Sequence, residues 1–227
     1  GFSRLQFSPD GSSIYLIGDG ASPEGDRPFL DRWTLADNSK QRLFRSEAPH
    51  YSAVSAVLDD SAGKILITRE SPADPVNFYR LDLAAKSAPV ALTQFPHPTP
   101  QLKDVKKEQI RYKRKDGVEL TGTLYLPPGF EPGRDAPLPL LMWAYPAEFK
   151  SAEAASQVTD SPYRFNAISY WGPHPFLARG YAVLDDPSMP IVGEGDKEPN
   201  DTYLPQLIAS AEAAIDYAVG QGFVDRA

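Results

Sequence analysis

The sequence predicts two halves of different fold class, an all-β half at residues 1–100 followed by an α/β half at residues 101–227. In the first half, short apolar runs alternate with turn residues, and none has the period of a helix. In the second half, a hairpin pattern precedes two near-continuous apolar runs and a long amphipathic segment, which is typical of a sheet covered on both faces. A proline-rich segment at residues 95–100 separates the halves, because proline removes a backbone donor and cannot continue a strand ladder.

The composition excludes several classes of function. With 227 residues and 41% apolar content, the chain can bury a sizeable core. A formal charge of -7 argues against a nucleic-acid partner, and no apolar run reaches the roughly 18 residues of a membrane span. There is no cysteine, and the first residues lack the regions of a signal peptide. The sequence therefore indicates neither a compartment nor an oligomeric state.

The first half contains two turn-and-strand patterns that each recur about fifty residues later. The first pattern is found at residues 7–17 and 58–68, and the second at residues 33–44 and 81–92. A period of about 40 to 50 residues with four strands is typical of β-propeller blades, so we expect two blades here. A closed propeller needs about four to eight blades. A generic antiparallel sandwich remains the alternative.

An antiparallel hairpin is expected to open the second half. Apolar residues alternate around the turn Asp116-Gly117, at Ile110, Tyr112, Val118, Leu120, Leu124 and Leu126. The basic residues between positions 103 and 115 are interrupted by acids and are expected to form a solvated strand face. The apolar run at 138–144 then predicts a strand covered on both faces.

Two helices and one further strand complete the expected elements. A helix over about 166–179, broken at Gly172-Pro173, leads to a covered strand at 181–184. The last helix runs over 200–220, with Asn200 or Asp201 as its cap. Its expected buried stripe comprises Leu204, Leu207, Ile208, Ala211, Ala214, Ile215, Ala218 and Val219. Strands that alternate with helices after a hairpin predict the first half of an α/β domain.

Most sequence signatures of catalysis are missing. There is no Gly-x-Ser-x-Gly nucleophile elbow. The three histidines, His50, His97 and His174, lie beside prolines or in predicted loops, and we expect surface or loop roles for them. The acidic pair Asp185-Asp186 is expected to lack any nearby imidazole, and no phosphate-binding loop is present, so neither a metal nor a cofactor is expected.

Position alone indicates one candidate site. In open α/β sheets, ligands bind beyond the carboxyl ends of the strands. Tyr145 follows one predicted strand, and Asp185 and Asp186 follow the other. The Tyr145 phenol could donate a hydrogen bond to a developing oxyanion, although spacing alone favours a packed aromatic at the rim of the sheet.

Several longer strings carry a family resemblance that extends over the whole chain. They lie at residues 79–83, 92–102, 122–129, 142–149, 177–185, 190–196 and 200–203. With these strings the chain resembles the prolyl oligopeptidase family of serine peptidases, and most closely its glutamyl endopeptidase branch.

The resemblance implies a β-propeller that caps an α/β-hydrolase domain and cleavage of peptides after an acidic residue by a Ser, Asp and His triad. It implies that Tyr145, which matches the family's oxyanion tyrosine, is a catalytic donor. The family's Ser, Asp and His are expected beyond Ala227, so the 227 residues alone are expected to be an inactive fragment. Residues 1–100 would be the last propeller blades, and residues 101–227 the first part of the catalytic domain, before the nucleophile.

Two alternatives stay open. The first is another hydrolase of the same fold, an acylaminoacyl peptidase or a prolyl oligopeptidase-like enzyme, because fold does not determine substrate. The second is a propeller-containing binding module without catalysis. The expected partner of the peptidase is a peptide substrate, with neither nucleic acid nor membrane involved.

Overall fold

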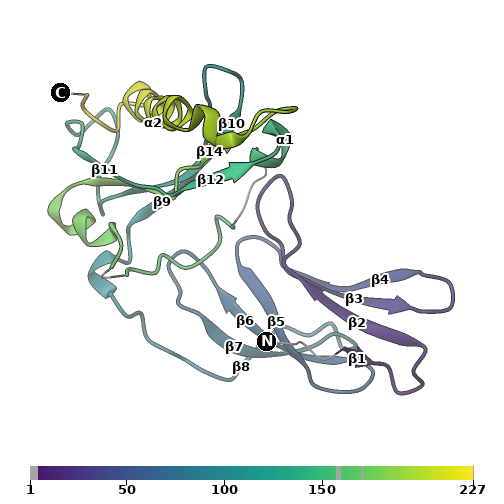
Figure 1. Ribbon diagram of the computed structural model, residues 1–227. Coiled ribbons are helices and arrows are strands. Elements are labelled where there is room, and N and C mark those ends of the chain that lie inside the picture. The colour runs from purple at the N-terminus through teal and green to yellow at the C-terminus, as the bar shows by residue number, and fades with distance from the viewer. Residues whose placement is uncertain (1–4, 157–159, 170, 227) are drawn as a thin grey trace. The chain divides into compact units, whose positions relative to one another are not determined.

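The computed structural model describes residues 5–156, 160–169 and 171–226. The chain divides into two compact units (Figure 1). The first comprises Gly1–Pro98 with Val158–Asn166, and the second comprises Thr99–Gln157 with Ala167–Ala227. Within the described ranges, no helix combines the length and apolar content that crossing a bilayer requires.

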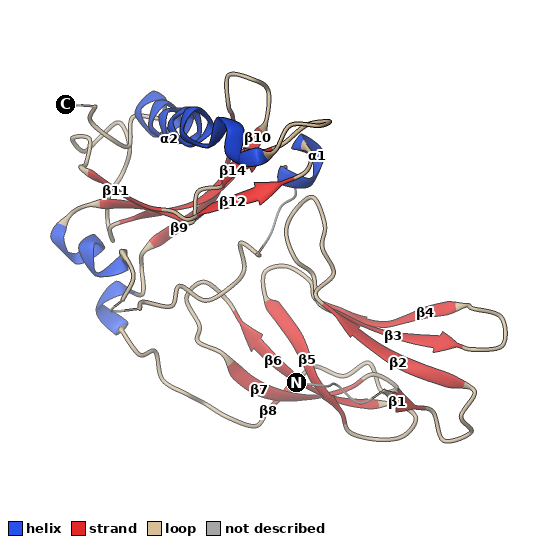
Figure 2. Cartoon of the chain, in the orientation of Figure 1, coloured by secondary structure: helices blue, strands red, loops and turns tan. Residues whose placement is uncertain are grey.

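The first unit consists of two four-stranded antiparallel sheets, each with its strands in chain order. The first sheet contains β1 (Gln6–Phe7), β2 (Ser13–Gly18), β3 (Phe29–Thr34) and β4 (Lys40–Arg45). The second contains β5 (Tyr51–Val57), β6 (Lys64–Glu70), β7 (Asn77–Asp82) and β8 (Val90–Ala91). Figure 2 shows only strands and loops in both sheets. They resemble propeller blades, as the fifty-residue repeat predicts.

The repeated turns occupy equivalent places in the two sheets, between the first and second strands of each. In the first sheet, Asp10 accepts hydrogen bonds from the Ser8 hydroxyl at 2.6 Å and the Ser12 amide at 3.1 Å. In the second, Asp59 accepts from the amides of Ser61 at 3.1 Å and Gly63 at 2.8 Å. The aspartates of the repeat thus hold their turns by side-chain to backbone bonds.

The core of the first unit lies between its two sheets. Its buried apolar residues come from both of them: Tyr15, Leu30, Val54, Ala62, Ile65 and Ile67. Successive side chains of a strand point to opposite faces, so Ile65 and Ile67 of β6 share the inner face, where both are fully buried.

A short segment from the later part of the chain also packs on the first unit. We call residues 160–166 the strap. The Asp160 carbonyl accepts from the Asp26 amide at 2.7 Å, and the Phe165 amide donates to Glu70 Oε2 at 2.8 Å. The Arg164 guanidinium lies 4.8 Å from the centroid of the Tyr51 ring. Nothing in the composition of residues 160–166 indicates this position.

The second unit has a four-stranded sheet in the order β11-β13-β10-β9. Its strands are β9 (Lys106–Lys113), β10 (Glu119–Leu126), β11 (Leu140–Trp143) and β13 (Ala182–Asp185). β9 and β10 form the predicted hairpin around Asp116-Gly117, and β13 runs antiparallel to β10 and parallel to β11. The short strands β12 (Pro146–Phe149) and β14 (Met189–Val192) form a separate parallel pair.

Among the residues that the structure describes, five helical segments accompany these strands. Two are α-helices, α1 (Ala152–Ala155) and α2 (Tyr203–Gly220), and three are 3₁₀ turns, η1 (Pro100–Leu102), η2 (His174–Arg179) and η3 (Pro199–Thr202). In Figure 1, α2 lies along one face of the sheet. The helix predicted over 166–179 forms only as η2, because Gly172 and Pro173 interrupt it.

The last helix differs from its prediction in start and buried face. It begins at Tyr203 after η3, and neither Asn200 nor Asp201 is its cap residue. The side chains buried most fully are small ones, Ser210, Ala214 and Ala218, whereas Leu204 and Ile208 are exposed. Small residues let the helix approach the sheet closely, so the largest apolar side chains of the stripe do not define the packed face.

Arg114 ties the hairpin to α2 and β14. Its guanidinium is buried and donates to the Pro190 carbonyl at 2.9 Å, the Ser210 hydroxyl at 3.1 Å and Gln206 Oε1 at 3.0 Å. The expectation of a solvated basic face is therefore wrong at this position. A planar guanidinium can serve several acceptors at once, which allows it to be buried.

Candidate functional site

The carboxyl ends of β11 and β13 meet at one edge of the second unit's sheet. The parallel register pairs Trp143 with Asp185, and the Asp186 amide donates to the Trp143 carbonyl at 2.9 Å. Asp186 has a left-handed backbone, with φ 46°, which ends the strand abruptly before Pro187. The structure thus brings together the two strand ends that the sequence singled out, Tyr145 and the Asp185-Asp186 pair.

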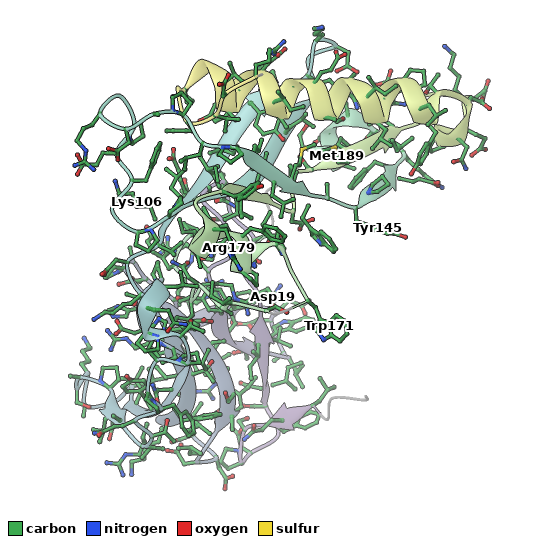
Figure 3. The ribbon with its side chains drawn as sticks, turned by 90° about the vertical axis from the view of Figure 1, so that its left-hand side faces the viewer. Asp19, Lys106, Tyr145, Trp171, Arg179 and Met189 are labelled. Atoms are coloured by element: carbon green, nitrogen blue, oxygen red, sulfur yellow. The ribbon has the colours of Figure 1, made fainter. Side chains whose placement is uncertain are left out.

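Tyr145 lies in the two-residue connection between β11 and β12. Tyr145 is 84% exposed, and Trp143 is 57% exposed. Figure 3 shows the Tyr145 side chain projecting from this connection. Among the described residues, the Tyr145 side chain is therefore exposed at the rim of the sheet rather than packed.

His174 is a residue of this region that sequence reasoning missed. It lies in η2 and is only 7% exposed. Its Nε2 is 3.3 Å from Asp185 Oδ2, and its ring packs edge-on against Tyr125 with 4.7 Å between centroids. The expectation of a surface or loop role for His174 is wrong, and so is the expectation that Asp185 lacks a nearby imidazole. The two lie eleven positions apart, on separate elements, and no local motif joins them.

Burial changes the acidity of both members of this pair. It lowers the pKa of His174, an effect that the charge of Asp185 partly opposes. Burial raises the pKa of Asp185, which the charge of His174 partly offsets and that of Asp186 reinforces. Lys107 acts on both groups and lowers both pKa values. Their desolvation disfavours charge, and their mutual attraction favours it.

The region offers no metal centre. No three His, Cys, Asp or Glu side chains of residues 5–156, 160–169 and 171–226 come together as metal ligands. The pair of His174 and Asp185 alone falls short of the three or more protein ligands of ordinary zinc sites.

The other two histidines lie in the first unit. His50 precedes β5 and contacts Arg69, and the His97 ring packs edge-on against Phe165 of the strap at 4.9 Å. Neither lies in the same compact unit as Tyr145.

A fifth chain segment reaches the open edge of β11. The Leu138 amide donates to the Phe223 carbonyl at 2.9 Å, and the Asp225 amide donates to the Leu138 carbonyl at 3.3 Å. This bridge between Leu138 and Val224 is parallel. Phe223 and Val224 are buried, so the segment that follows α2 is packed beside β11.

Comparison with known proteins gives a consistent result. No family model matches the chain. Over 229 aligned positions it is 45% identical to a probable chloroplastic glutamyl endopeptidase of Oryza sativa subsp. japonica, covering 97% of this chain and 24% of that protein. It is also 45% identical to the Arabidopsis thaliana protein of the same description, covering 96% of this chain and 23% of that one. The chain therefore spans about a quarter of the length of these curated relatives.

Solved structures share the fold at low identity. Oligopeptidase B from Leishmania major matches with a TM-score of 0.58 at 12% identity, over 98% of this chain and 30% of that one. Dipeptidyl peptidase 4 of Porphyromonas gingivalis matches with a TM-score of 0.59 at 20% identity and the same coverages. The AtxE2 isopeptidase matches with a TM-score of 0.58 at 17% identity, over 98% of this chain and 33% of that one. The chain is thus homologous to a quarter-length part of the glutamyl endopeptidases and has the fold found in the prolyl oligopeptidase family.

Proposed function

We propose that the complete protein is a serine peptidase that cleaves peptide bonds after glutamate by acyl transfer through a Ser, Asp and His triad. The identity of 45% over nearly the whole chain to proteins described as glutamyl endopeptidases supports this reaction. In this proposal, residues 1–100 are propeller blades, and residues 101–227 are the first part of an α/β-hydrolase domain.

The observation that carries the proposal is the place of Tyr145 at the carboxyl end of β11. The segment at Val224 runs parallel to β11, so a strand that continued it would end at the same edge as Tyr145. A nucleophile at the end of that strand would lie at the same edge of the sheet as the exposed Tyr145 phenol. Tyr145 would then donate to the oxyanion of the tetrahedral intermediate.

The triad itself is expected outside the 227 residues. No Gly-x-Ser-x-Gly occurs in the sequence, so we propose that these residues alone do not hydrolyse peptides. No observation favours a binding module without catalysis. None favours cleavage after a residue other than glutamate.

A substrate panel on the purified full-length protein tests the proposal. Matched chromogenic peptides would carry Glu, Gln or Pro at the cleaved position. We expect cleavage after Glu, and its loss on treatment with a serine-reactive phosphonate. Cleavage that prefers Pro or Gln, or resists the phosphonate, would reject the proposed reaction.

A further inference from the structure

A hollow of about 520 Å³ lies at one end of the second sheet of the first unit. It opens where β6 ends and where β5 and β7 begin, and we call it the Arg69 hollow. The residues that matter for its chemistry are His50, Arg69, Tyr79, Phe95 and the acids Glu70 and Asp74. The strap binds at this same end of the sheet, through Glu70 and Pro72.

Arg69 gives the hollow a positive charge. Its Nη2 is 2.9 Å from Nδ1 and 3.0 Å from Nε2 of His50, and its guanidinium carbon is 5.8 Å from the centroid of the Tyr79 ring. Among the described residues, no carboxylate forms an ion pair with Arg69. A half-buried guanidinium whose nearest partners are an imidazole and an aromatic ring retains donors for an anion.

The two acids of the lining are held by other groups. Glu70 follows Arg69 in β6 and so points to the opposite face of the strand. It accepts from the Phe165 amide at 2.8 Å and lies 3.6 Å from the Arg164 guanidinium of the strap. Asp74 accepts from the Ser71 hydroxyl at 2.7 Å and closes the turn before β7. Neither acid neutralises Arg69 by a direct ion pair.

His50 does not change the net charge of the hollow. Burial and the charge of Arg69 lower the pKa of the imidazole, and Asp74 opposes this. A neutral imidazole can accept a hydrogen bond from Arg69, so the pair keeps a single positive charge. Ser46 fixes the turn that carries His50, because its hydroxyl donates to the His50 carbonyl at 3.2 Å.

An apolar wall stands beside this charge. The Asn77 side chain is buried and accepts from the Thr93 hydroxyl at 2.8 Å and from the Phe95 amide at 2.7 Å. These bonds hold the segment after β8 so that Phe95 lines the hollow while more than half exposed. With Tyr79 and Phe95 as walls and Arg69 as the charged group, the hollow suits a short aliphatic chain that ends in a carboxylate.

We propose that the Arg69 hollow binds a carboxylate of an acidic peptide, with Arg69 donating to the carboxylate oxygens and Tyr79 and Phe95 contacting the carbon chain. That the ligand is a peptide rests on the proposed function. The carboxylate belongs either to an acidic side chain or to the peptide's C-terminus, and the two share this chemistry.

Equilibrium binding to the full-length protein tests the site without using turnover. The probe for a side-chain carboxylate is N-acetyl-glutamate α-amide, and its uncharged match is N-acetyl-glutamine α-amide. The probe for a terminal carboxylate is N-acetyl-alanine. We expect at least one carboxylate probe to bind in preference to the glutamine probe, and its binding to raise the pKa of His50, followed by NMR of labelled histidine.

Variants separate the charge from the fold. Arg69→Gln is expected to weaken carboxylate binding roughly 10- to 100-fold, as loss of a charge-assisted bond does, and Arg69→Lys is expected to retain the preference for charge. Arg80→Gln is the matched control, because Arg80 is an exposed arginine of β7 that does not line the hollow. It should leave binding unchanged.

The outcomes separate this site from the proposed function. If the protein cleaves after glutamate but does not prefer the carboxylate probes to the glutamine probe, the proposed binding site is rejected and the proposed peptidase function stands. Equal affinity of Arg69→Gln and the unaltered protein also rejects the site. If the protein cleaves none of the peptides, but carboxylate binding is lost in Arg69→Gln and kept in Arg80→Gln, the proposed peptidase function is rejected and the binding site stands.

Discussion

His174 of η2 and Asp185 of β13 form a largely buried pair, with 3.3 Å between Nε2 and Oδ2. Asp185 is the last residue of β13, and the chain turns at the next residue, Asp186, which has a left-handed backbone. Because the Asp186 amide binds the Trp143 carbonyl, a group that holds Asp185 also holds the connection to Tyr145. A structural pair thus supports the edge where the proposed oxyanion donor lies.

The acidity of His174 can be measured directly. We expect its pKa below the usual value of about 6.5, because burial is the dominant effect on it. Asp185→Asn should lower that pKa further, since the Asp185 carboxylate is the group that raises it. NMR titration of labelled histidine in the full-length protein gives both values. A pKa that rises in Asp185→Asn would contradict the assigned pairing.

The same shift has a consequence for stability. A histidine whose folded pKa is lowered binds fewer protons in the folded state than in the unfolded state. The stability linked to His174 is therefore fully present at a pH above the pKa of the unfolded state. It is lost as the pH falls through that pKa toward the lower pKa of the folded state. His174→Gln should flatten this part of the stability curve between about pH 7 and pH 5, measured by denaturant unfolding.

Tyr145→Phe tests the oxyanion role. In the full-length protein it should lower kcat roughly 10- to 1000-fold, as the loss of one oxyanion donor does. Because Tyr145 is exposed, the midpoint of unfolding should not change. Tyr181→Phe is the control, since Tyr181 precedes β13 and lies at the opposite end of that strand. A kcat for Tyr145→Phe equal to that of the control would remove Tyr145 from catalysis.

Arg114 and Lys113 are adjacent residues of the hairpin with different expected energetics. Arg114→Met leaves the Ser210 hydroxyl and the Pro190 carbonyl without their buried donor, and should cost roughly 2 to 4 kcal/mol of unfolding free energy. Lys113→Met removes only a surface ion pair with Glu119 and should cost less than about 1 kcal/mol. Chemical denaturation of both variants makes the comparison. Equal losses would show that burial of the guanidinium contributes nothing beyond the charge itself.

Local patterns explain which elements could be predicted. The β9-β10 hairpin follows from Asp116-Gly117 and alternating apolar residues, and the strand β13 follows from a short apolar run. The two four-stranded sheets follow from a repeat whose aspartates hold equivalent turns. The hairpin and strand signals are local, and the sheet signal is a local turn-and-strand pattern that recurs after about fifty residues.

Other features depend on contacts between distant residues. The strap binds Asp26, Glu70 and Pro72, which lie about 90 to 130 positions away, so its own sequence carries little trace of its place. The pairing of His174 with Asp185 requires η2 to pack against β10 and β13. For α2, tertiary packing of small side chains overrides the stripe that Leu204 and Ile208 suggest.

The turn at Asp10 provides a test of the first unit. The Ser8 hydroxyl, followed by the Ser12 amide, lowers the pKa of Asp10 to about 2. A carboxyl group whose folded pKa is lowered contributes stability above its unfolded value, and that contribution is lost as the pH falls toward the folded value. Ser8→Ala should raise the pKa of Asp10, because the Ser8 hydroxyl is the largest cause of the shift. Carbon NMR of labelled aspartate would measure it, with Asp59, whose pKa is lowered chiefly by Ser61, as the internal control. An Asp10 pKa that stays near 2 in Ser8→Ala would show that the amide and hydroxyl of Ser12 are sufficient to stabilise the carboxylate.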